Sequence, residues 1–201
     1  LGNYESTTGT RCSTAIPTFT TTTIQPQTAE GVTFPSTVVK PTVLDGVRVE
    51  RFNAGNSGTT AGVTVNGAKG AVISNVRIDN APAVMTSYGV NVVNGGDVIL
   101  SRDRIDAGDG SAESIAVRSV GSRVALQNNC NSLDAFGRCS TACGGPGGVT
   151  YASIRGRTQP SNGISYGVLL QDSPDSTIET SALCAASGDT AAMIRIAGEG
   201  A

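Results

Sequence analysis

The sequence lacks histidine and tryptophan altogether, and it contains only four tyrosines and four phenylalanines among its 201 residues. The absence of histidine excludes Ser-His-Asp and Cys-His nucleophilic sites and removes the commonest side-chain ligand for metals. Charged residues make up 15% of the chain, below the roughly 25% typical of soluble domains. A formal net charge of −2 predicts no binding of nucleic acid, and without a long apolar run we expect no insertion into a membrane.

What the sequence does contain is an internal repeat. The run Val43–Glu50 returns as Val72–Asp79 and again as Ile99–Asp106, with matching hydrophobic and charged positions. Weaker copies begin further along the chain, at Ala125, Thr150 and Thr177. The six starts are therefore separated by steps of 29, 27, 26, 25 and 27 residues.

A second series of short runs lies beside the first. Its members are Val32–Phe34, Val63–Val65, Val90–Val92, Ile115–Val117, Val168–Leu170 and Ile194–Ile196. The gap of 53 residues between positions 115 and 168 equals two periods, so we expect Thr141–Cys143 to occupy the missing place. Alternation with period two between Gly, Asn, Asp and Ser clusters predicts strands, and no window keeps a helical period.

Short strands that recur at this interval predict an all-β fold, a solenoid of parallel strands with about six coils of 25–29 residues over residues 32–201. Glycine and asparagine are expected at the corners, where a left-handed backbone conformation is needed. We predict two interior columns, one of Leu44, Ile73, Leu100, Leu126, Tyr151 and Ile178 and one of Val49, Ile78 and Ile105. We expect residues 1–31 to form an irregular Thr-rich segment, as a partial coil, a cap or a disordered linker, and the whole to be a piece of a longer chain.

The Gly-Val-x-Val pattern followed by a run such as Val72–Ile78 extends over about residues 31–198. It resembles the repeats of right-handed parallel β-helices of the pectin-lyase-like architecture, and it is most similar to long secreted bacterial β-helix proteins of unassigned function. The resemblance implies a right-handed solenoid and an extracellular or cell-surface location, and it carries almost no information about activity.

Charged residues are aligned by the repeat. Arg48, Arg77, Arg104 and Arg155 are predicted to share one column, interrupted by Cys130, and Glu50, Asp79 and Asp106 follow two positions later. Stacked like charges repel, and a neighbouring column of opposite sign offsets that repulsion. We therefore expect a solvated, ion-paired face rather than a basic groove for an anionic glycan.

The densest carboxylate cluster provides weak calcium candidates in Asp106, Asp109 and Glu113. Its spacing matches no known calcium loop, so an exposed turn is the preferred interpretation. The best carboxylates for a glycosidase are Asp103, Asp106 and Asp109, but the motifs of β-helix hydrolases are missing. We predict no catalytic residues and no cofactor.

Five cysteines make an odd count, namely Cys12, Cys130, Cys139, Cys143 and Cys184. A secreted protein would use them in disulfides among Cys130, Cys139 and Cys143, with Cys184 or Cys12 as further partners. If Cys130 and Cys184 lie two coils apart, about 9.6 Å separates them along the axis, which is too far for a disulfide. We therefore expect a bond within residues 130–143 and leave Cys184 and Cys12 unassigned.

The preferred function is that of a non-catalytic extracellular structural or surface protein that assembles end to end into a rod or fibre. Two alternatives stay open. One is an adhesin-like module that binds a glycan or a protein through the connections Asn53–Ala61, Ala107–Ser114 and Leu133–Gly148; the other is a β-helix polysaccharide lyase or hydrolase. A groove lined by aromatic and basic residues would favour either alternative.

Overall fold

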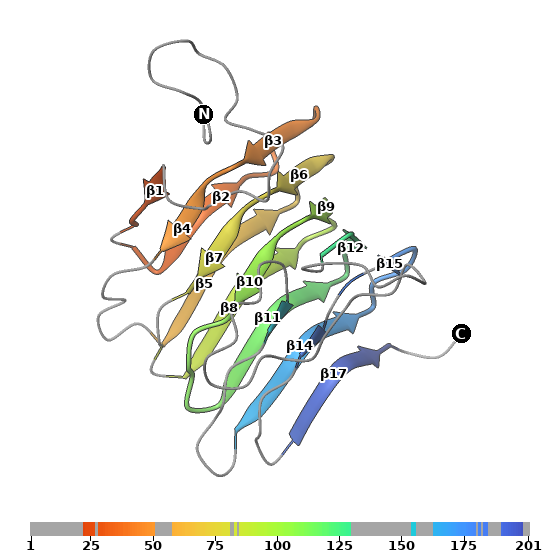
Figure 1. The fold of residues 1–201 in the computed structure, drawn as a ribbon. Helices are drawn as coiled ribbons and strands as arrows, with labels where there is room; N and C mark the ends of the chain where they lie inside the picture. The colour runs from red at the N-terminus through yellow and green to blue at the C-terminus, as the bar shows by residue number, and fades with distance from the viewer. Residues whose placement is uncertain are drawn as a thin grey trace, which may run out of the picture.

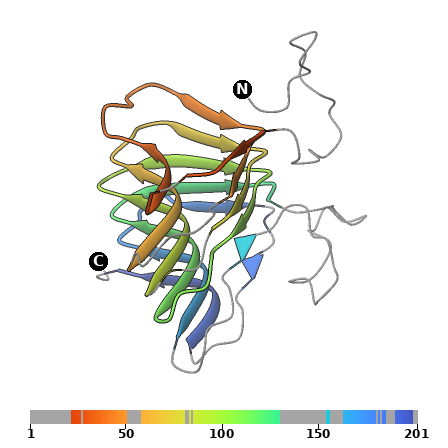
Figure 2. The same cartoon turned by 90° about the vertical axis from the view of Figure 1, so that its left-hand side faces the viewer.

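The computed structural model of the chain describes residues 22–26, 28–50, 58–80, 83, 85–129, 154–155, 163–179, 181, 183–184 and 190–198. These residues form parallel strands that stack side by side from one end of the molecule to the other (Figures 1 and 2). The described part contains no helix, and hence none that is long and apolar enough to cross a membrane.

The strands form three sheets. Sheet 1 contains the longest strands, β2 (Glu30–Phe34), β5 (Thr59–Asn66), β8 (Thr86–Val93), β11 (Glu113–Val120), β14 (Ile164–Gln171) and β17 (Thr190–Ala197). Sheet 2 contains β3 (Thr42–Asp45), β6 (Ala71–Ser74), β9 (Asp97–Ser101), β12 (Arg123–Gln127) and β15 (Thr177–Glu179). Sheet 3 contains β1 (Thr23–Ile24), β4 (Arg48–Glu50), β7 (Arg77–Asp79), β10 (Arg104–Asp106), β13 (Ile154–Arg155) and β16 (Leu183–Cys184).

The chain passes through sheets 1, 2 and 3 in that order, and each complete round adds one strand to each sheet. Five complete coils result, β2–β4, β5–β7, β8–β10, β11–β13 and β14–β16, with β1 before them and β17 after them. The predicted all-β solenoid of parallel strands is confirmed. The number of complete coils is slightly below the six expected.

The eight-residue repeat unit is bent into two strands rather than one. The corner between sheet 2 and sheet 3 falls at Gly46, Asn75, Arg102 and Asn128, whose φ angles are 66°, 52°, 59° and 56°. Glycine and asparagine reach this left-handed region at little cost, which confirms their predicted place at corners. Arg102 adopts the same angle between β9 and β10.

The register differs from expectation where the repeat was faintest. β11 pairs directly with β14, and β12 pairs directly with β15, so the long gap is one coil with an insertion and not two coils. No place is left for Thr141–Cys143 in sheet 1 or for Tyr151 in sheet 2; these residues lie outside the described part. Within sheet 1, Val117 stands opposite Val90, so the predicted alignment of Ile115 with Val90 was wrong by two residues.

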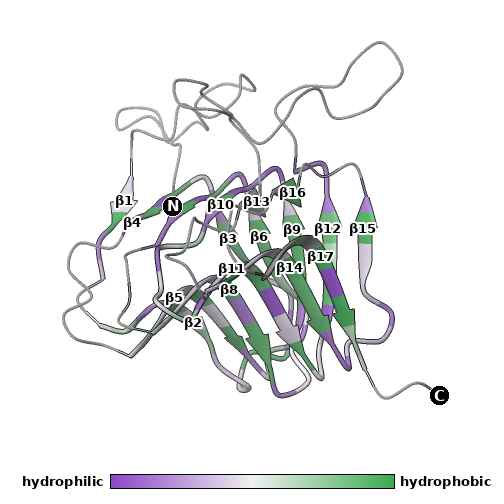
Figure 3. Ribbon diagram, turned by 90° about the horizontal axis from the view of Figure 1, so that it is seen from below, coloured by the Kyte–Doolittle hydropathy of each residue, from purple (hydrophilic) through white to green (hydrophobic). Residues whose placement is uncertain are grey.

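The core lies inside the three sheets. Val49, Ile78 and Ile105 are in register and fully buried, as predicted. In the other predicted column, Ile73, Leu100 and Leu126 are buried, and Leu44 and Ile178 at its ends are partly buried. Hydrophobic and hydrophilic residues alternate along the strands in Figure 3, because successive side chains point to opposite faces.

Candidate functional site

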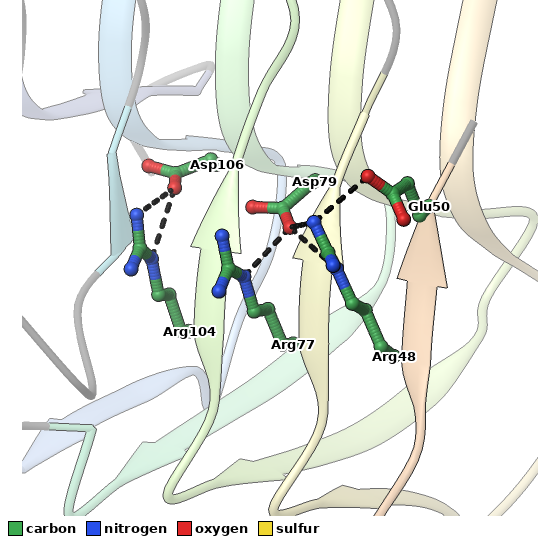
Figure 4. Close-up of polar contacts among 6 residues, drawn as sticks. All are labelled: Arg48, Glu50, Arg77, Asp79, Arg104 and Asp106. Atoms are coloured by element: carbon green, nitrogen blue, oxygen red, sulfur yellow. Dashed lines mark hydrogen bonds and ion pairs between the residues drawn. The ribbon is translucent and has the colours of Figure 1, made fainter. Parts of the chain in front are cut away.

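The outer face of sheet 3 carries the predicted columns of charge. Arg48, Arg77 and Arg104 are in register, and so are Glu50, Asp79 and Asp106 (Figure 4). The Arg48 guanidinium donates to Glu50 Oε1 at 2.8 Å and to Asp79 Oδ2 at 3.0 Å, which links β4 to β7. Arg77 lies 2.6 Å from the same Asp79 oxygen, and Arg104 donates twice to Asp106 Oδ2.

These ion pairs are less solvated than expected. The side chain of Asp106 is only 2% exposed and that of Asp79 is 15% exposed. The three arginines are more exposed than these acids but are also partly buried. Arg48, Arg77 and Arg104 each meet at least one carboxylate, so these three described arginines leave no surplus of positive charge. Such paired charges offer little to an anionic ligand, and the pair between Arg48 and Asp79 joins two neighbouring coils.

Arg155 does not belong to the arginine column. It stands opposite Asp106 on one side and Cys184 on the other, in line with the acids rather than with Arg104. The prediction failed because the insertion before β13 shifts the count by two residues, a shift that repeat spacing alone does not reveal.

The carboxylates predicted as weak calcium ligands are not brought together. Asp106 pairs with Arg104, Glu113 accepts a hydrogen bond from the Tyr88 hydroxyl at 3.0 Å, and Asp109 is exposed. Within the described ranges, no group of three or more His, Cys, Asp or Glu residues is arranged to hold a metal ion.

Asp103, the remaining glycosidase candidate, is fully buried at the corner between sheets 2 and 3. Its Oδ1 accepts a hydrogen bond from the Val76 backbone N–H at 2.8 Å, and its Oδ2 has no hydrogen-bond partner. Burial raises the pKa of this carboxyl well above its usual range, and the hydrogen bonds from Val76 and Ser101 oppose the shift. Asn129 occupies the same place in the next coil and donates to the Leu100 carbonyl oxygen. Asp103 is therefore part of a corner ladder, and its side chain does not meet Asp106 or Asp109 in one site.

The predicted disulfides fall on residues that the structure does not describe, namely Cys12, Cys130, Cys139 and Cys143. Cys184 lies in β16, opposite Arg155. One premise is corrected: β12, just before Cys130, pairs directly with β15, just before Cys184. The two coils are adjacent, so the distance argument against a Cys130–Cys184 bond does not hold.

The outer face of sheet 1 carries a feature that the sequence analysis missed. In the strands of this sheet, two successive residues face the core. At Gly89 an added side chain would meet Ile105 in the core, and the next residue, Val90, is itself buried. The residue before this pair therefore points outward in each coil. Across the sheet this outward column reads Ala61, Tyr88, Ile115, Tyr166 and Ala192. Its larger members form an apolar cluster separate from the core.

Each tyrosine of this column lies beneath an arginine from the next coil. The Arg118 guanidinium lies 5.2 Å from the centre of the Tyr88 ring, and that of Arg195 lies 5.6 Å from the centre of the Tyr166 ring. Arg118 also donates to Asn91 Oδ1 at 2.9 Å, and Arg195 donates to the Tyr166 hydroxyl at 2.7 Å. We call these residues, with Leu169 between the arginines, the tyrosine–arginine face.

The pKa of the Tyr88 hydroxyl depends on the charged groups around it on this face. Burial raises that pKa, the negative charge of Glu113 raises it further, and the positive charge of Arg118 lowers it. The arginine therefore acts on the ring electrostatically as well as by stacking.

A signal for this column was present in the sequence. Ser87-Tyr88-Gly89-Val90 and Ser165-Tyr166-Gly167-Val168 are the same tetrapeptide, and they flank the long insertion. Aligning them would have placed the two tyrosines in one column and corrected the register of Ile115.

Comparison with protein-family models, with curated proteins and with solved structures finds no match to this chain.

Proposed function

We propose that this chain is a non-catalytic module of an extracellular rod or fibre, in which the solenoid continues from one unit into the next. In this proposal the coils are of the right-handed, pectin-lyase-like kind that the repeats resemble, on a secreted bacterial protein. The scattered placement of Asp103, Asp106 and Asp109 supports a role without catalysis.

One observation carries the proposal. The interior column of sheet 1 that contains the buried Val65 and Val92 ends on Ile196, which is 77% exposed, and its neighbour Ile194 is 42% exposed. At the other end of the same column Phe34 is only 5% exposed. Among the described strands, none pairs with the outer edge of β17, the terminal strand of sheet 1 in Figure 1.

One further coil would satisfy both the open edge and the exposed isoleucines. A contact that adds strands along the axis is heterologous and does not close on itself, so it yields filaments rather than dimers. The predicted assembly therefore depends on β17.

The test is sedimentation of the chain over a range of concentrations, beside Ile196→Lys and the control Met85→Lys. Met85 is also exposed but lies just before β8, an inner strand of sheet 1, and so away from both ends of the solenoid. We expect mass to increase with concentration for the parent and the control, and not for Ile196→Lys. A single 20 kDa species for the parent at high concentration would contradict the proposal.

A second candidate function is a binding module for a glycan or a protein partner. The tyrosine–arginine face supports it, because Arg118, Leu169 and Arg195 gather there on one outer surface above the nearly buried tyrosines. In this second proposal the candidate site lies on a sheet and not on the long connections proposed from the sequence. β5 and β11 begin at Thr59 and Glu113, inside two of those connections.

A further inference from the structure

The arginines of the tyrosine–arginine face form no ion pair with a described acid; the nearest acid that shares a contact with them is Glu113, which accepts the hydrogen bond of the Tyr88 hydroxyl beneath Arg118. None of the ion pairs between described residues includes Arg118 or Arg195. Their hydrogen bonds go to the neutral oxygens of Asn91 and Tyr166. A guanidinium has five donors, so most of the donors of both remain available to an anion.

The two arginines are placed in a defined order. Asn91, Arg118, Leu169 and Arg195 are successive members of one outward column. Two strand spacings, about 9.6 Å, separate the backbone positions of the arginines, and Leu169 lies between them. Leu169 packs against the apolar cluster and is only partly buried. By backbone register the column therefore presents a basic, an apolar and a basic residue in a line along the axis. Each guanidinium leans onto the preceding coil, Arg118 over Tyr88 and Arg195 over Tyr166, so the two charges keep a separation of two strands.

We propose that this column binds a helical segment of a protein partner that carries a carboxylate, an apolar side chain and a second carboxylate along one face. The inference rests on the second proposed function, that of a binding module, and is independent of rod assembly. Carboxylates accept the paired N–H donors of a guanidinium, and Leu169 supplies the apolar contact between them.

The spacing favours a helix over an extended segment. Residues i and i+7 of an α-helix lie about 10.5 Å apart along its axis, with i+3 and i+4 between them on the same face. In an extended strand, three successive residues on one face span about 13 Å. A glycan fits less well, because Tyr88 and Tyr166 are 8% and 3% exposed and leave no open ring on which a sugar could stack.

The probe is a labelled alanine-based helical peptide with Glu at i, Leu at i+4 and Glu at i+7, followed by fluorescence anisotropy. A scrambled peptide of equal composition places the two Glu residues on opposite faces, and polygalacturonate serves as the glycan arm. We expect the matched peptide to bind at least tenfold more tightly than the scrambled one, and polygalacturonate to compete poorly.

Variants then locate the contact. Arg118→Gln and Arg195→Gln should each weaken binding of the matched peptide about tenfold, and Leu169→Ser should remove the preference for a Leu-containing peptide. The control Arg123→Gln removes the same charge from a surface ion pair with Asp97 on sheet 2 and should change affinity less than twofold. Thermal melting of each variant establishes that it is folded, and Arg195→Gln, on the terminal strand, remains informative if Arg118→Gln is not.

Equal binding of the matched and scrambled peptides would overturn the helical partner. Tighter binding of polygalacturonate would assign the face to a glycan, and would overturn the protein partner while preserving a binding module. Failure of every anion to bind would contradict both.

Discussion

The outer faces of sheets 1 and 3 both carry arginines aligned by the repeat, but the groups that contact these arginines differ between the two faces. On sheet 3 every arginine of the column meets a carboxylate, as Arg104 meets Asp106. On sheet 1, Arg118 and Arg195 lie over tyrosine rings and bond to neutral oxygens. The same residue type is therefore paired with acids on one face and with neutral groups on the other, where its contacts join β11 to β8 and β17 to β14.

Spacing explains the difference. Arg48, Arg77 and Arg104 occupy adjacent coils, about 4.8 Å apart, where like charges repel unless acids intervene. Arg118 and Arg195 are separated by Leu169, so their repulsion is weaker and no acidic column is required.

The largest loss of stability is expected from a substitution in the core, against which sheets 1 and 3 both pack. Ile78 is fully buried beneath sheet 3, next to the inward position of Gly62 in sheet 1. Ile78→Ala should lower the free energy of unfolding by about 2–5 kcal/mol, because the narrow core cannot close around the cavity. Urea unfolding measures this, with Val72→Ala on the outer side of sheet 2 as the control. A loss below about 1 kcal/mol would show that the interior adjusts freely.

How much the sequence predicted depended on how clear the repeat was. Strong copies, such as Val72–Asp79 and Ile99–Asp106, predicted the register of sheets 2 and 3 and the buried places of Ile78 and Ile105 correctly. The insertion after β12 is close to one repeat in length, so repeat spacing alone predicts an extra coil there that the strand pairing does not contain. Arg155 was misplaced for that reason.

The tyrosine–arginine face was missed for a different reason. Tyr88 and Arg118 are 30 residues apart and come from different coils, so no local motif joins them. Their meeting depends on two successive inward positions, which strict alternation does not predict.

On sheet 3, loss of one acid should leave an arginine without its ion pair and lower the free energy of unfolding. Asp79 serves both Arg48 and Arg77, and Asp79→Ala would leave Arg77 partly buried without a carboxylate. We expect a loss of about 1–3 kcal/mol, between the values for exposed and for fully buried ion pairs. Chemical unfolding at low and high salt checks this. The control is Asp97→Ala, whose partner Arg123 is more exposed and should matter less.

Asp103 offers a contrast with its paired neighbour Asp106. Its raised pKa means that folding favours the protonated form, so its contribution to stability is greatest below about pH 4 and declines as the pH rises toward the folded-state pKa. Asp103→Asn keeps the acceptor for Val76 N–H, cannot ionise and mimics Asn129 of the next coil. We expect a gain of about 1 kcal/mol at pH 7 and a flatter pH dependence, measured by thermal unfolding from pH 3 to 8. A loss of stability at pH 7 would contradict the ladder.

The smallest effect on stability is expected on sheet 1. Arg118→Gln removes one cation–π contact and one hydrogen bond from a partly exposed side chain, so the loss should stay within about 1 kcal/mol.

The electrostatic effect of Arg118→Gln is nevertheless measurable, because the positive charge of Arg118 lowers the pKa of Tyr88. Without that charge the Tyr88 hydroxyl should titrate at a still higher pH, whereas Glu113→Gln should shift its titration downward, because the negative charge and its hydrogen bond are both lost as causes of the raised pKa. Ultraviolet titration of the tyrosines, with Tyr88→Phe to identify the signal, distinguishes these opposite shifts. An unchanged titration in Arg118→Gln, with the downward shift still seen in Glu113→Gln, would mean that the Arg118 charge does not act at the Tyr88 ring.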